Sequence, residues 1–467
     1  MSELTGKHVL VLGLGESGLA MARWCALRGA RLRVADSRAV PPGLEALRED
    51  APLAEIVSGG FGAEVLDGID LVALSPGLDP RTGVAAEACR RGLPVTGEMS
   101  LLAQALAELG VRGRSRILAI TGTNGKTTTT ALTAALAQSA GIDAVAAGNI
   151  SPAALDVLME RLELGIELPA CWVLELSSFQ LETLDGLDAE AATVLNVSDD
   201  HLDRYAGVEA YAATKAAIFQ GQGVQVLNRQ DARVAAMALP GRRVIRFGVD
   251  APHGAETDYG IACHNGADWL VRGHQPLLAL AELALAGRHN AANALAALAL
   301  CEAGLDMAPA QLIAGLRAFR GLPHRVELVA ERADGVRFYD DSKGTNVGAT
   351  VAALDGFDRP VVLIAGGDGK GQDFSPLAPA VAGRARAVLL IGRDAALIEA
   401  ALAGTGVPLE HAADLETAVV RAAELAQQGD AVLLSPACAS FDMFRGYAHR
   451  AEVFIAAVRR LPEVDAR

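Results

Sequence analysis

The sequence predicts an α/β protein of three domains built on parallel sheets. Short apolar runs alternate along the chain with longer Ala- and Leu-rich stretches of helical spacing, and this alternation is typical of βαβ units. The alternation begins anew at three places, near residues 8, 116 and 321. A chain of 467 residues also suits two to four domains, at roughly 100–200 residues each.

Each of the three segments supplies its own expected strands. The first segment has a strand at 8–15 that runs into glycines, a helix at 19–27, and strands at 30–37 and 71–77. The second opens with a strand at 116–121 and continues with strands at 171–177 and 192–198. The third has strands at 336–342, 361–367, 387–392 and 431–436. Short polar, glycine-containing joints at 111–116 and 319–325 predict domains 1–110, 111–320 and 321–467.

The amino-acid composition and net charge disfavour several classes of function. Hydrophobic residues make up 51% and charged residues 21% of the chain, which predicts a packed core. The net charge of −15 disfavours nucleic acid as a partner. Six scattered cysteines without a C-x-x-C pair indicate neither a zinc knuckle nor a redox motif. The chain has no apolar run of about 18 residues and no signal-peptide pattern at its start, so we expect a cytoplasmic protein without membrane insertion.

A glycine-rich loop at 121–128 is the strongest local signal. Its sequence, TGTNGKTT, follows an apolar strand and precedes a helical stretch at 129–140. Glycines let the backbone approach an anion, and N–H groups at the helix start point at it. Lys126 would then face the β- and γ-phosphates, and the Thr127 hydroxyl would bind Mg²⁺. Ile120 occupies the first glycine position of the full pattern, and a turn with an exposed lysine is the alternative interpretation.

A second glycine turn, Gly13 to Gly18, fits G-x-G-x-x-G after a strand. Asp36 closes the next strand, about 20 residues on, where an acidic residue meets a ribose in dinucleotide-binding folds. Taken alone, this pattern predicts an NAD-dependent dehydrogenase. Other nucleotides use the same turn, and a tight β–α turn that binds nothing remains an alternative.

Three further candidate site residues of the second segment come after the phosphate loop. Glu175 ends one strand, and His201 lies in a carboxylate-rich stretch after the next. Ligands bind at that edge of open α/β sheets, and a carboxylate there suits Mg²⁺. Lys215 stands among small residues in a helical stretch at 210–219. A lone histidine or helical lysine is usually structural or solvated, so only their combination with the phosphate loop indicates a site.

In the third segment, polar residues again follow strand ends. Asp341, Ser342 and Lys343 follow one strand, Lys370 follows the next, and Ser440 follows the last. We expect these loops to converge on one face of a sheet. Two lysines and a hydroxyl there suit an anionic carboxylate substrate; ordinary surface loops are the alternative.

Taken together, these segments resemble the Mur ligases over essentially the whole chain. The motifs that carry the resemblance are TGTNGKTT (121–128), ELSSFQLE (175–182), LNVSDDHLDRY (195–205), HNAANALAA (289–297), GLPHR (321–325), DSKGTN (341–346), GGDGKGQDFSPL (366–377) and SPACASFDMF (435–444). The resemblance implies an N-terminal Rossmann-like UDP-binding domain, a central P-loop ATPase-like domain and a C-terminal Rossmann-like domain for the amino acid. It implies ATP-dependent ligation of D-glutamate to UDP-N-acetylmuramoyl-L-alanine through an acyl phosphate, in peptidoglycan synthesis.

The resemblance also implies roles for individual residues. The expected catalytic residues are Lys126, Glu175, His201 and Lys215, and the expected ligands of two Mg²⁺ ions are Thr127, Glu175, His201 and Lys215 carbamylated by CO₂. The expected ATP contacts are Gly122, Thr123, Asn124, Gly125, Lys126, Thr127, Thr128, Asn290, Asn293, Arg325 and Asp341. The expected contacts of the UDP-sugar are Leu14, Ser17, Asp36, Ser37, Arg38, Ser75, Pro76, Gly77 and Asn149. The expected D-glutamate contacts are Lys343, Thr345, Lys370, Ser440, Phe441 and Tyr447, where Tyr447 stands in place of an expected phenylalanine. A monomer is implied.

Several hypotheses stay open at this point. A ligase for L-glutamate or another amino acid would share the chemistry, because stereochemistry depends on pocket geometry. A folylpolyglutamate synthase would share the ATP chemistry but would not need residues 1–110 as a UDP domain. An NAD-dependent oxidoreductase leaves the Lys126 loop unexplained. A regulatory nucleotide-binding module predicts ATP binding without ligation.

Overall fold

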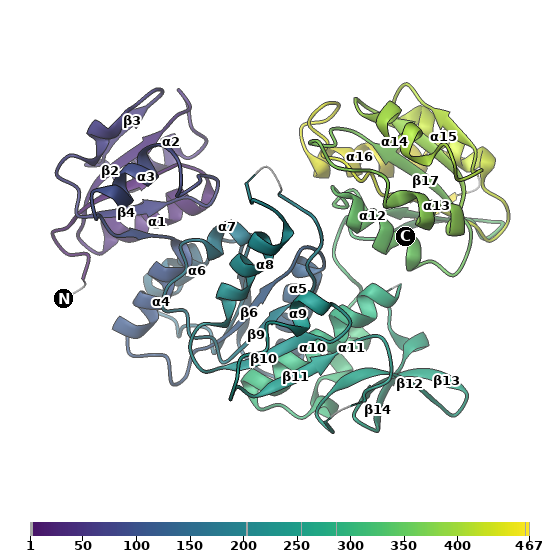
Figure 1. The fold of residues 1–467 in the computed structure, drawn as a ribbon, viewed down its shortest axis with the longest axis horizontal. Helices are drawn as coiled ribbons and strands as arrows, with labels where there is room; N and C mark the ends of the chain where they lie inside the picture. Colours follow the sequence, from purple (N-terminus) through teal and green to yellow (C-terminus); the bar gives the residue numbers. More distant parts are fainter. Residues whose placement is uncertain (1–2, 202–203, 254, 286, 463, 467) are drawn as a thin grey trace. The chain divides into compact units, whose positions relative to one another are not determined.

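The computed structural model describes residues 3–201, 204–253, 255–285, 287–462 and 464–466. Within these residues the strands form three sheets, of five, nine and seven strands, and helices flank them (Figure 1). Most strand pairs are parallel, as the alternation of strands and helices predicts. The predicted α/β class with three domains is therefore confirmed.

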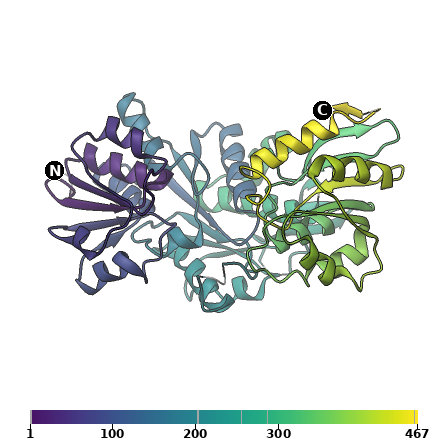
Figure 2. The same ribbon diagram turned by 90° about the horizontal axis from the view of Figure 1, so that it is seen from above.

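The N-terminal sheet has the order β3-β2-β1-β4-β5 and is parallel throughout. Its strands are β1 (His8–Leu12), β2 (Arg31–Asp36), β3 (Glu55–Ser58), β4 (Leu71–Leu74) and β5 (Val95–Thr96), and its helices are α1 (Glu16–Leu27), α2 (Leu44–Asp50) and α3 (Gly83–Arg90). Along β1, Val9 and Val11 join one buried cluster, while Leu10 and Leu12 join another. Both faces are thus covered, by α1 on one side and α3 on the other (Figure 2). The strand order reverses between β1 and β4, where open α/β sheets bind ligands.

The middle sheet has the order β14-β13-β12-β11-β10-β9-β6-β8-β7. Its strands are β6 (Arg116–Thr121), β7 (Ala144–Gly148), β8 (Cys171–Glu175), β9 (Ala191–Val194), β10 (Val224–Asn228), β11 (Val244–Phe247), β12 (Tyr259–His264), β13 (Ala267–Arg272) and β14 (Gln275–Ala279). Its main helices are α4 (Glu98–Glu108), α5 (Lys126–Ser139), α6 (Ala154–Glu163), α7 (Ser178–Leu181), α8 (Val208–Ala216), α9 (Ala232–Ala235), α10 (Arg288–Leu305) and α11 (Ile313–Ala318). In the parallel register Ile120 pairs with Glu175, and Thr121 pairs with Val194. The ends of β6, β8 and β9 therefore meet at one edge.

The third sheet has the order β19-β18-β17-β20-β16-β15-β21. Its strands are β15 (Glu327–Arg332), β16 (Arg337–Asp340), β17 (Val361–Gly366), β18 (Ala385–Ile391), β19 (Leu409–His411), β20 (Ala431–Leu434) and β21 (Val464–Ala466), and its helices are α12 (Val347–Asp355), α13 (Leu377–Arg384), α14 (Ala395–Leu402), α15 (Leu415–Leu425) and α16 (Tyr447–Val458). Alternate residues of β17 face two separate clusters, one with α12 to α14 and one with α15 and α16. The strands β15 and β21 are antiparallel additions at one edge, which the sequence rhythm did not predict.

The chain packs into two compact units. One comprises residues 1–262, 271–277 and 294–316, and the other comprises 263–270, 278–293 and 317–467. The first unit contains both the N-terminal sheet and the phosphate loop, joined by a buried cluster to which α1, α4 and α6 all contribute. The domain limits 1–110, 111–320 and 321–467 stay a prediction, because these units follow packing and not sequence segments.

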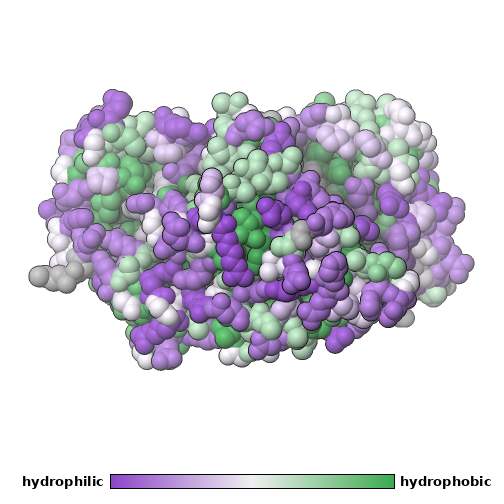
Figure 3. Space-filling model, turned by 60° about the horizontal axis from the view of Figure 1, so that its bottom comes forward, coloured by the Kyte–Doolittle hydropathy of each residue, from purple (hydrophilic) through white to green (hydrophobic). Residues whose placement is uncertain are grey.

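Hydrophilic residues predominate on the face shown in Figure 3, and apolar residues there form small separate groups. Among the described residues, no single helix has the length and hydropathy needed to cross a bilayer. The segments 288–305 and 309–318 meet that test only when they are taken together across a bend of 116°.

Candidate active site

The loop after β6 has the geometry of an anion-binding turn. Gly125 caps α5 with a φ of 82°, a left-handed conformation that glycine adopts at little cost. The Lys126 ammonium turns back over the loop and donates to the carbonyls of Gly122 at 2.9 Å and Thr123 at 2.8 Å. The predicted strand, loop and helix are therefore present, with a cation held beside the N-terminus of a 14-residue helix.

Asn196, which the sequence analysis left without a role, holds this loop from the neighbouring strand. Its side chain accepts from the Asn124 N–H at 2.8 Å and donates to the Asn124 carbonyl at 3.0 Å. Its own carbonyl accepts from the Thr123 N–H at 2.9 Å. In the sequence, Asn196 is only an asparagine just after an apolar strand, and this position does not predict its hydrogen bonds to the phosphate loop.

Glu175 lies at the end of β8 and is 2% exposed. Its Oε1 atom accepts from the side-chain amide of Asn149 at 2.7 Å. Its Oε2 atom is buried and has no hydrogen-bond partner within the described residues. A buried carboxylate oxygen ordinarily has a partner, so this atom fits the hard oxygen ligand that Mg²⁺ prefers. Asn149, expected at the UDP-sugar, contacts Glu175 in this structure.

Lys215 lies on α8 and is only 1% exposed, although helical spacing alone predicted a solvated side chain. Its ammonium donates to the Gly122 carbonyl at 3.0 Å and lies 4.4 Å from the ring centre of Tyr211. Burial, and then the nearby charge of Lys126, lower its pKa well below the usual value, while Asp200 and Glu175 act in the opposite direction. The tertiary structure therefore brings a second lysine to the phosphate loop.

His201 follows β9 in a left-handed conformation, with a φ of 52°. Its ring centre lies 4.6 Å from that of Phe179 and 6.2 Å from that of Tyr211. Its backbone N–H donates to Asp200 at 3.0 Å. The neighbouring positions 202 and 203 of the predicted 195–205 motif lie outside the described residues. His201 thus shares the Tyr211 ring with Lys215.

The first glycine turn follows β1, at the point where the strand order reverses. A Cβ atom at Gly18 would lie 1.9 Å from the Gly13 carbonyl oxygen, so only glycine lets α1 start this close to the strand. Ser17 lies within the turn, Ser37 and Arg38 are exposed beyond β2, and Ser75 to Gly77 follow β4. Leu14 is fully buried. The remaining residues expected at the UDP-sugar therefore lie at this edge of the sheet.

Asp36 uses both carboxylate oxygens within the protein. Oδ2 accepts from the Leu14 N–H at 2.7 Å and from the Arg38 guanidinium at 2.6 Å, and Oδ1 accepts from the Arg38 backbone and side chain. The Arg38 hydrogen bond lowers the pKa of Asp36 to about 2. Because its oxygens hold the glycine turn, Asp36 is poorly placed to receive the ribose hydroxyls that a dehydrogenase would bind. Arg38 is exposed, and the contact of Asp36 or Arg38 with the UDP-sugar stays a prediction.

Replacing Asp36 with Asn is expected to lower the free energy of unfolding at pH 7 by about 1–2 kcal/mol. Because folding lowers the pKa of Asp36, its ionised carboxylate stabilises the folded protein above the unfolded-state pKa of 3.8. That stabilisation is lost as the pH falls towards about 2. Denaturant unfolding of both proteins between pH 7 and pH 2 would measure it. As a control, Asp334→Asn removes a similar but more exposed fork with Arg332 and should change stability less. The prediction would be contradicted if the difference in free energy of unfolding between wild type and Asp36→Asn did not become smaller at acid pH.

Glu98 begins α4 and is 2% exposed, and it was missed by the sequence analysis. Its Oε1 atom accepts from the N–H groups of Ala154 at 2.7 Å and Leu155 at 3.4 Å, in the first turn of α6. Burial raises its pKa to about 7, and hydrogen bonding from Ser17 acts against this rise. The carboxylate therefore joins the start of α4 to the first turn of α6. A glutamate at a helix start gives no sign of such burial.

We expect the Glu98→Gln variant to gain stability relative to the wild type as the pH rises from 5 to 8, by about 2 kcal/mol. The folded protein holds a proton on Glu98 up to about pH 7, whereas the unfolded chain loses it near 4.5. Rising pH through this window therefore destabilises only the wild type. Denaturant unfolding of both proteins at four pH values would measure the difference, and a constant difference would refute the assignment.

The loops of the third sheet converge as predicted. The strands that precede them, β16, β20 and β17, are neighbours, and Asp340, Leu434 and Ile364 stand in register. A short bridge between Asp368 and Ala439 ties the Lys370 loop to the Ser440 loop. The expected D-glutamate contacts on these loops are Lys343, Thr345, Lys370, Ser440 and Phe441, of which Ser440 is buried and Phe441 is 74% exposed. Tyr447 begins α16. The ammonium of Lys343 lies 3.8 Å from the ring centre of Tyr447.

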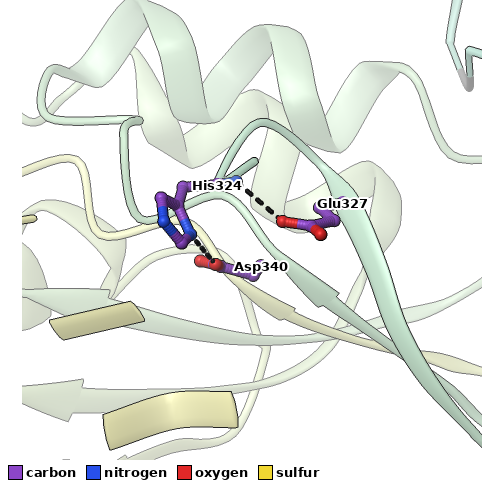
Figure 4. A group of neighbouring side chains, drawn as sticks. All are labelled: His324, Glu327 and Asp340. Carbon is purple, nitrogen blue, oxygen red and sulfur yellow. Dashed lines mark hydrogen bonds and ion pairs between the residues drawn. The ribbon is translucent and has the colours of Figure 1, made fainter. Parts of the chain in front are cut away.

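A histidine clamp, formed by His324, Glu327 and Asp340, precedes these loops (Figure 4). A hydrogen bond joins His324 Nδ1 to the buried Asp340 carboxylate at 2.7 Å, and Glu327 accepts from the His324 N–H at 2.9 Å. Their atoms lie within 4.8 Å and would also suit a divalent cation, but the hydrogen bonds already account for the cluster. Arg325 stands between two left-handed residues, with φ of 64° and 49°. The clamp thus stabilises a strained backbone around Arg325.

Other expected ATP contacts lie in the second compact unit. Asn290 and Asn293 begin α10, are each 7% exposed and hydrogen-bond to one another at 3.2 Å. Asp341 is buried and accepts from the Ser435 hydroxyl at 2.7 Å. Burial raises the pKa of Asp341 to about 7, although Ser435 and then Arg325 lower it. The role of these residues in binding ATP stays a prediction.

Arg450 is a buried residue of this region that the sequence analysis missed. It is fully buried on α16 and donates to the Ser342 side chain at 3.0 Å, the Ser342 carbonyl at 2.8 Å and the Cys438 carbonyl at 3.1 Å. One guanidinium therefore joins the loops that carry Lys343 and Ser440. No signal in the sequence indicated this role, because the partners at 342 and 438 are distant from Arg450 along the chain.

Three family models match the chain in order. Residues 7–97 match the N-terminal domain of MurD-like Mur ligases, residues 120–301 match the Mur ligase middle domain, and residues 324–438 match the Mur ligase glutamate ligase domain. Among solved structures, the fold is similar to UDP-N-acetylmuramate-alanine ligase MurC from Thermotoga maritima, with a TM-score of 0.59 and 18% identity over 97% of this chain and 99% of that one. An Acinetobacter baumannii UDP-N-acetylmuramoylalanyl-D-glutamyl-2,6-diaminopimelate–D-alanyl-D-alanyl ligase has a TM-score of 0.56 at 18% identity, over 99% and 92% of the chains.

Curated relatives are much closer in sequence. The UDP-N-acetylmuramoylalanine–D-glutamate ligase of Aromatoleum aromaticum is 80% identical over 466 residues, covering 100% of both chains. The ligase of the same name from Dechloromonas aromatica is 57% identical over 462 residues, covering 98% of this chain and 99% of its own. Identity at this level over the full length, with all three domain models in order, shows that this chain belongs to the Mur ligase family.

Proposed function

We propose that this protein ligates D-glutamate to UDP-N-acetylmuramoyl-L-alanine in an ATP-dependent reaction of peptidoglycan synthesis. The observation that carries the proposal is the meeting of two lysines at one carbonyl of the phosphate loop. Lys126 and Lys215 donate to the Gly122 oxygen at 2.9 and 3.0 Å, close to the buried Glu175. A nucleotide-binding module needs only the first lysine. A second lysine that is buried there, and that can become a metal ligand as described below, suits a reaction that brings a γ-phosphate and a carboxylate together.

The reaction has two balanced steps. A carboxylate oxygen of the UDP-sugar attacks the γ-phosphorus of ATP, a new P–O bond forms, and the bond to the leaving ADP breaks. The amine of D-glutamate then attacks the acyl carbon, the C–N bond forms, inorganic phosphate leaves, and the amine loses a proton. Both steps join anions, so charge neutralisation and positioning dominate catalysis. Lys126 supplies a fixed cation at the transferred phosphate.

Mur ligases use ATP with Mg²⁺, and the residues here fit that ion. The Thr127 hydroxyl stands in the first turn of α5, and Glu175 offers its buried Oε2. We propose these two for one ion, and His201 with Lys215 for a second. Mg²⁺ supplies electrostatic stabilisation of the phosphoryl oxygens when it is bound.

We further propose that Lys215 is carbamylated. The lone pair of its neutral amine attacks the carbon of CO₂, an N–C bond forms and a proton is released. Because burial lowers the pKa of Lys215, more of the amine is neutral at pH 7. The product carries a carboxylate, which removes the repulsion from Lys126 and gives a metal ligand. This explains a lysine where a metal site needs an anion.

The remaining assignments belong to the same proposal. Arg38 and the 75–77 loop would hold the UDP-sugar, and Lys343, Lys370 and Ser440 would hold D-glutamate. The three domain limits, a monomeric state and a cytoplasmic location are also proposed here.

Phosphate release from ATP and Mg²⁺ tests the function directly. The assay contains UDP-N-acetylmuramoyl-L-alanine and either D- or L-glutamate, with each component omitted in turn. Release that needs both the UDP-sugar and D-glutamate is the expected result. Release with L-glutamate alone would overturn the stereochemistry, and no release with either amino acid would overturn the proposed function.

A further inference from the structure

A largely buried ion pair connects two segments of the candidate site. The Arg204 guanidinium pairs with the carboxylate of Glu182, and the two side chains are only 9% and 8% exposed. Glu182 directly follows α7, and Arg204 follows the His201 segment. Removing two charges from water is costly unless the geometry is good. Further contacts of the two side chains must therefore offset the cost of removing their charges from water.

The same guanidinium reaches the loop after β4. Arg204 donates to the carbonyls of Pro76 at 3.3 Å and Leu78 at 2.8 Å. From that loop Arg81 reaches back, donating to the Arg204 carbonyl at 3.0 Å and to Glu182 at 3.2 Å. The 75–81 loop, which carries expected contacts to the UDP-sugar, is thus held from both directions.

An aromatic contact continues the connection towards the phosphate loop. The Arg204 guanidinium carbon lies 4.1 Å from the ring centre of Phe179, and that ring lies 4.6 Å from His201. Beyond His201, the Tyr211 ring packs against Lys215. A continuous series of contacts within one compact unit therefore runs from the 75–81 loop to the two lysines.

We propose that Arg204 and Glu182 are positioning residues, which fix the 75–81 loop relative to His201 and the phosphate loop. This inference rests on the proposed function, in which the substrate carboxylate must meet the γ-phosphate. Neither residue touches the reacting atoms. A misplacement of about 1 Å costs roughly a hundredfold in rate, so loss of this pair should impair the chemical step as well as UDP-sugar binding.

The Arg204→Lys variant tests whether the planar guanidinium, and not only its charge, is required. Arg204→Lys retains the charge but cannot serve Glu182 and two carbonyls while stacking on Phe179. We expect KM for the UDP-sugar to rise about tenfold and kcat to fall about tenfold or more, while KM for ATP changes less than about twofold. Glu182→Gln should act in the same direction, and the double variant should be no worse than the poorer single one.

Arg161→Lys is a matched control, because Arg161 forms a forked pair with Asp143 in the same compact unit and contacts neither loop. It should leave all parameters unchanged. Thermal unfolding of each variant separates positioning from folding, and Glu182→Gln carries the test if Arg204→Lys does not fold. Unchanged kinetic parameters, or losses of activity that only follow the loss of folded protein, would overturn the inference.

Binding of the UDP-sugar without ATP, measured by calorimetry, separates the two levels of the proposal. Weaker binding by Arg204→Lys than by wild type supports the positioning role even if ligation with D-glutamate fails. Equal binding by the two proteins, together with equal kcat, overturns it. A wild type that neither binds the UDP-sugar nor releases phosphate overturns both this inference and the proposed function.

Discussion

The Lys126→Ala variant is expected to lose ligation, with kcat/KM for ATP falling about 10²–10³-fold. In the wild type the ammonium is held by the carbonyls of Gly122 and Thr123, directly before α5. A fixed cation there is expected to neutralise charge on the transferred phosphate without reorganisation during the reaction. Alanine keeps the helix but removes that charge. Phosphate release at several ATP concentrations would measure the change.

Lys7 provides the matched control for this change. It is an exposed lysine just before β1, so Lys7→Ala alters the net charge equally without touching the loop. We expect Lys7→Ala to keep wild-type kinetics and both variants to keep a wild-type thermal midpoint. A Lys126→Ala protein with more than half of the wild-type kcat/KM would remove Lys126 from the mechanism.

The second large effect is expected for Lys215→Ala, which should lower kcat at least about a hundredfold. If Lys215 acts as a carbamate, a small carboxylate such as formate should restore part of the activity. The cavity left by the truncated side chain can admit it, and its charge replaces the lost anion. Titration of the variant with formate in the phosphate-release assay would measure the recovery.

Formate distinguishes the roles of the two lysines. Lys126→Ala lacks a cation, so formate should not rescue it, and this variant is the control for a general effect of the salt. Wild-type protein depleted of CO₂ should also lose activity and regain it with bicarbonate. Full activity of Lys215→Ala, or an equal response of both variants to formate, would reject the carbamate.

The strands that the sequence predicted are short and apolar. The strands β1, β6, β8, β17 and β20 lie within the predicted ranges, and β9 begins one residue before its range, because burial on both faces leaves a nearly continuous apolar run. The strands β12 to β14 and the antiparallel β15 and β21 were not predicted. Several of their side chains are partly exposed, and strands of this kind depend on their neighbours more than on local propensity.

The candidate site was predictable to the extent that strand ends define it. In a parallel sheet the loops after neighbouring strands share an edge, so Glu175 was correctly expected beside the phosphate loop, and the three loops of the third sheet were correctly expected together. The sequence did not predict how charged residues would be used. Asp36 hydrogen-bonds to Arg38 and to the glycine turn, which the motif did not predict, and its contact with a ligand stays a prediction.

The amino-acid sequence by itself determined the α/β class, the phosphate loop with Lys126, and the family, because these depend on local order along the chain. Only the tertiary structure decided that Lys215, Glu98 and Arg450 are buried and that Arg204 is largely buried. Each of them has partners far away in sequence, as when Lys215 bonds to Gly122 and Arg204 to Leu78. A charged side chain is buried only where the folded chain supplies its hydrogen-bond partners. The spacing of residues along the sequence does not predict partners that are distant in the chain.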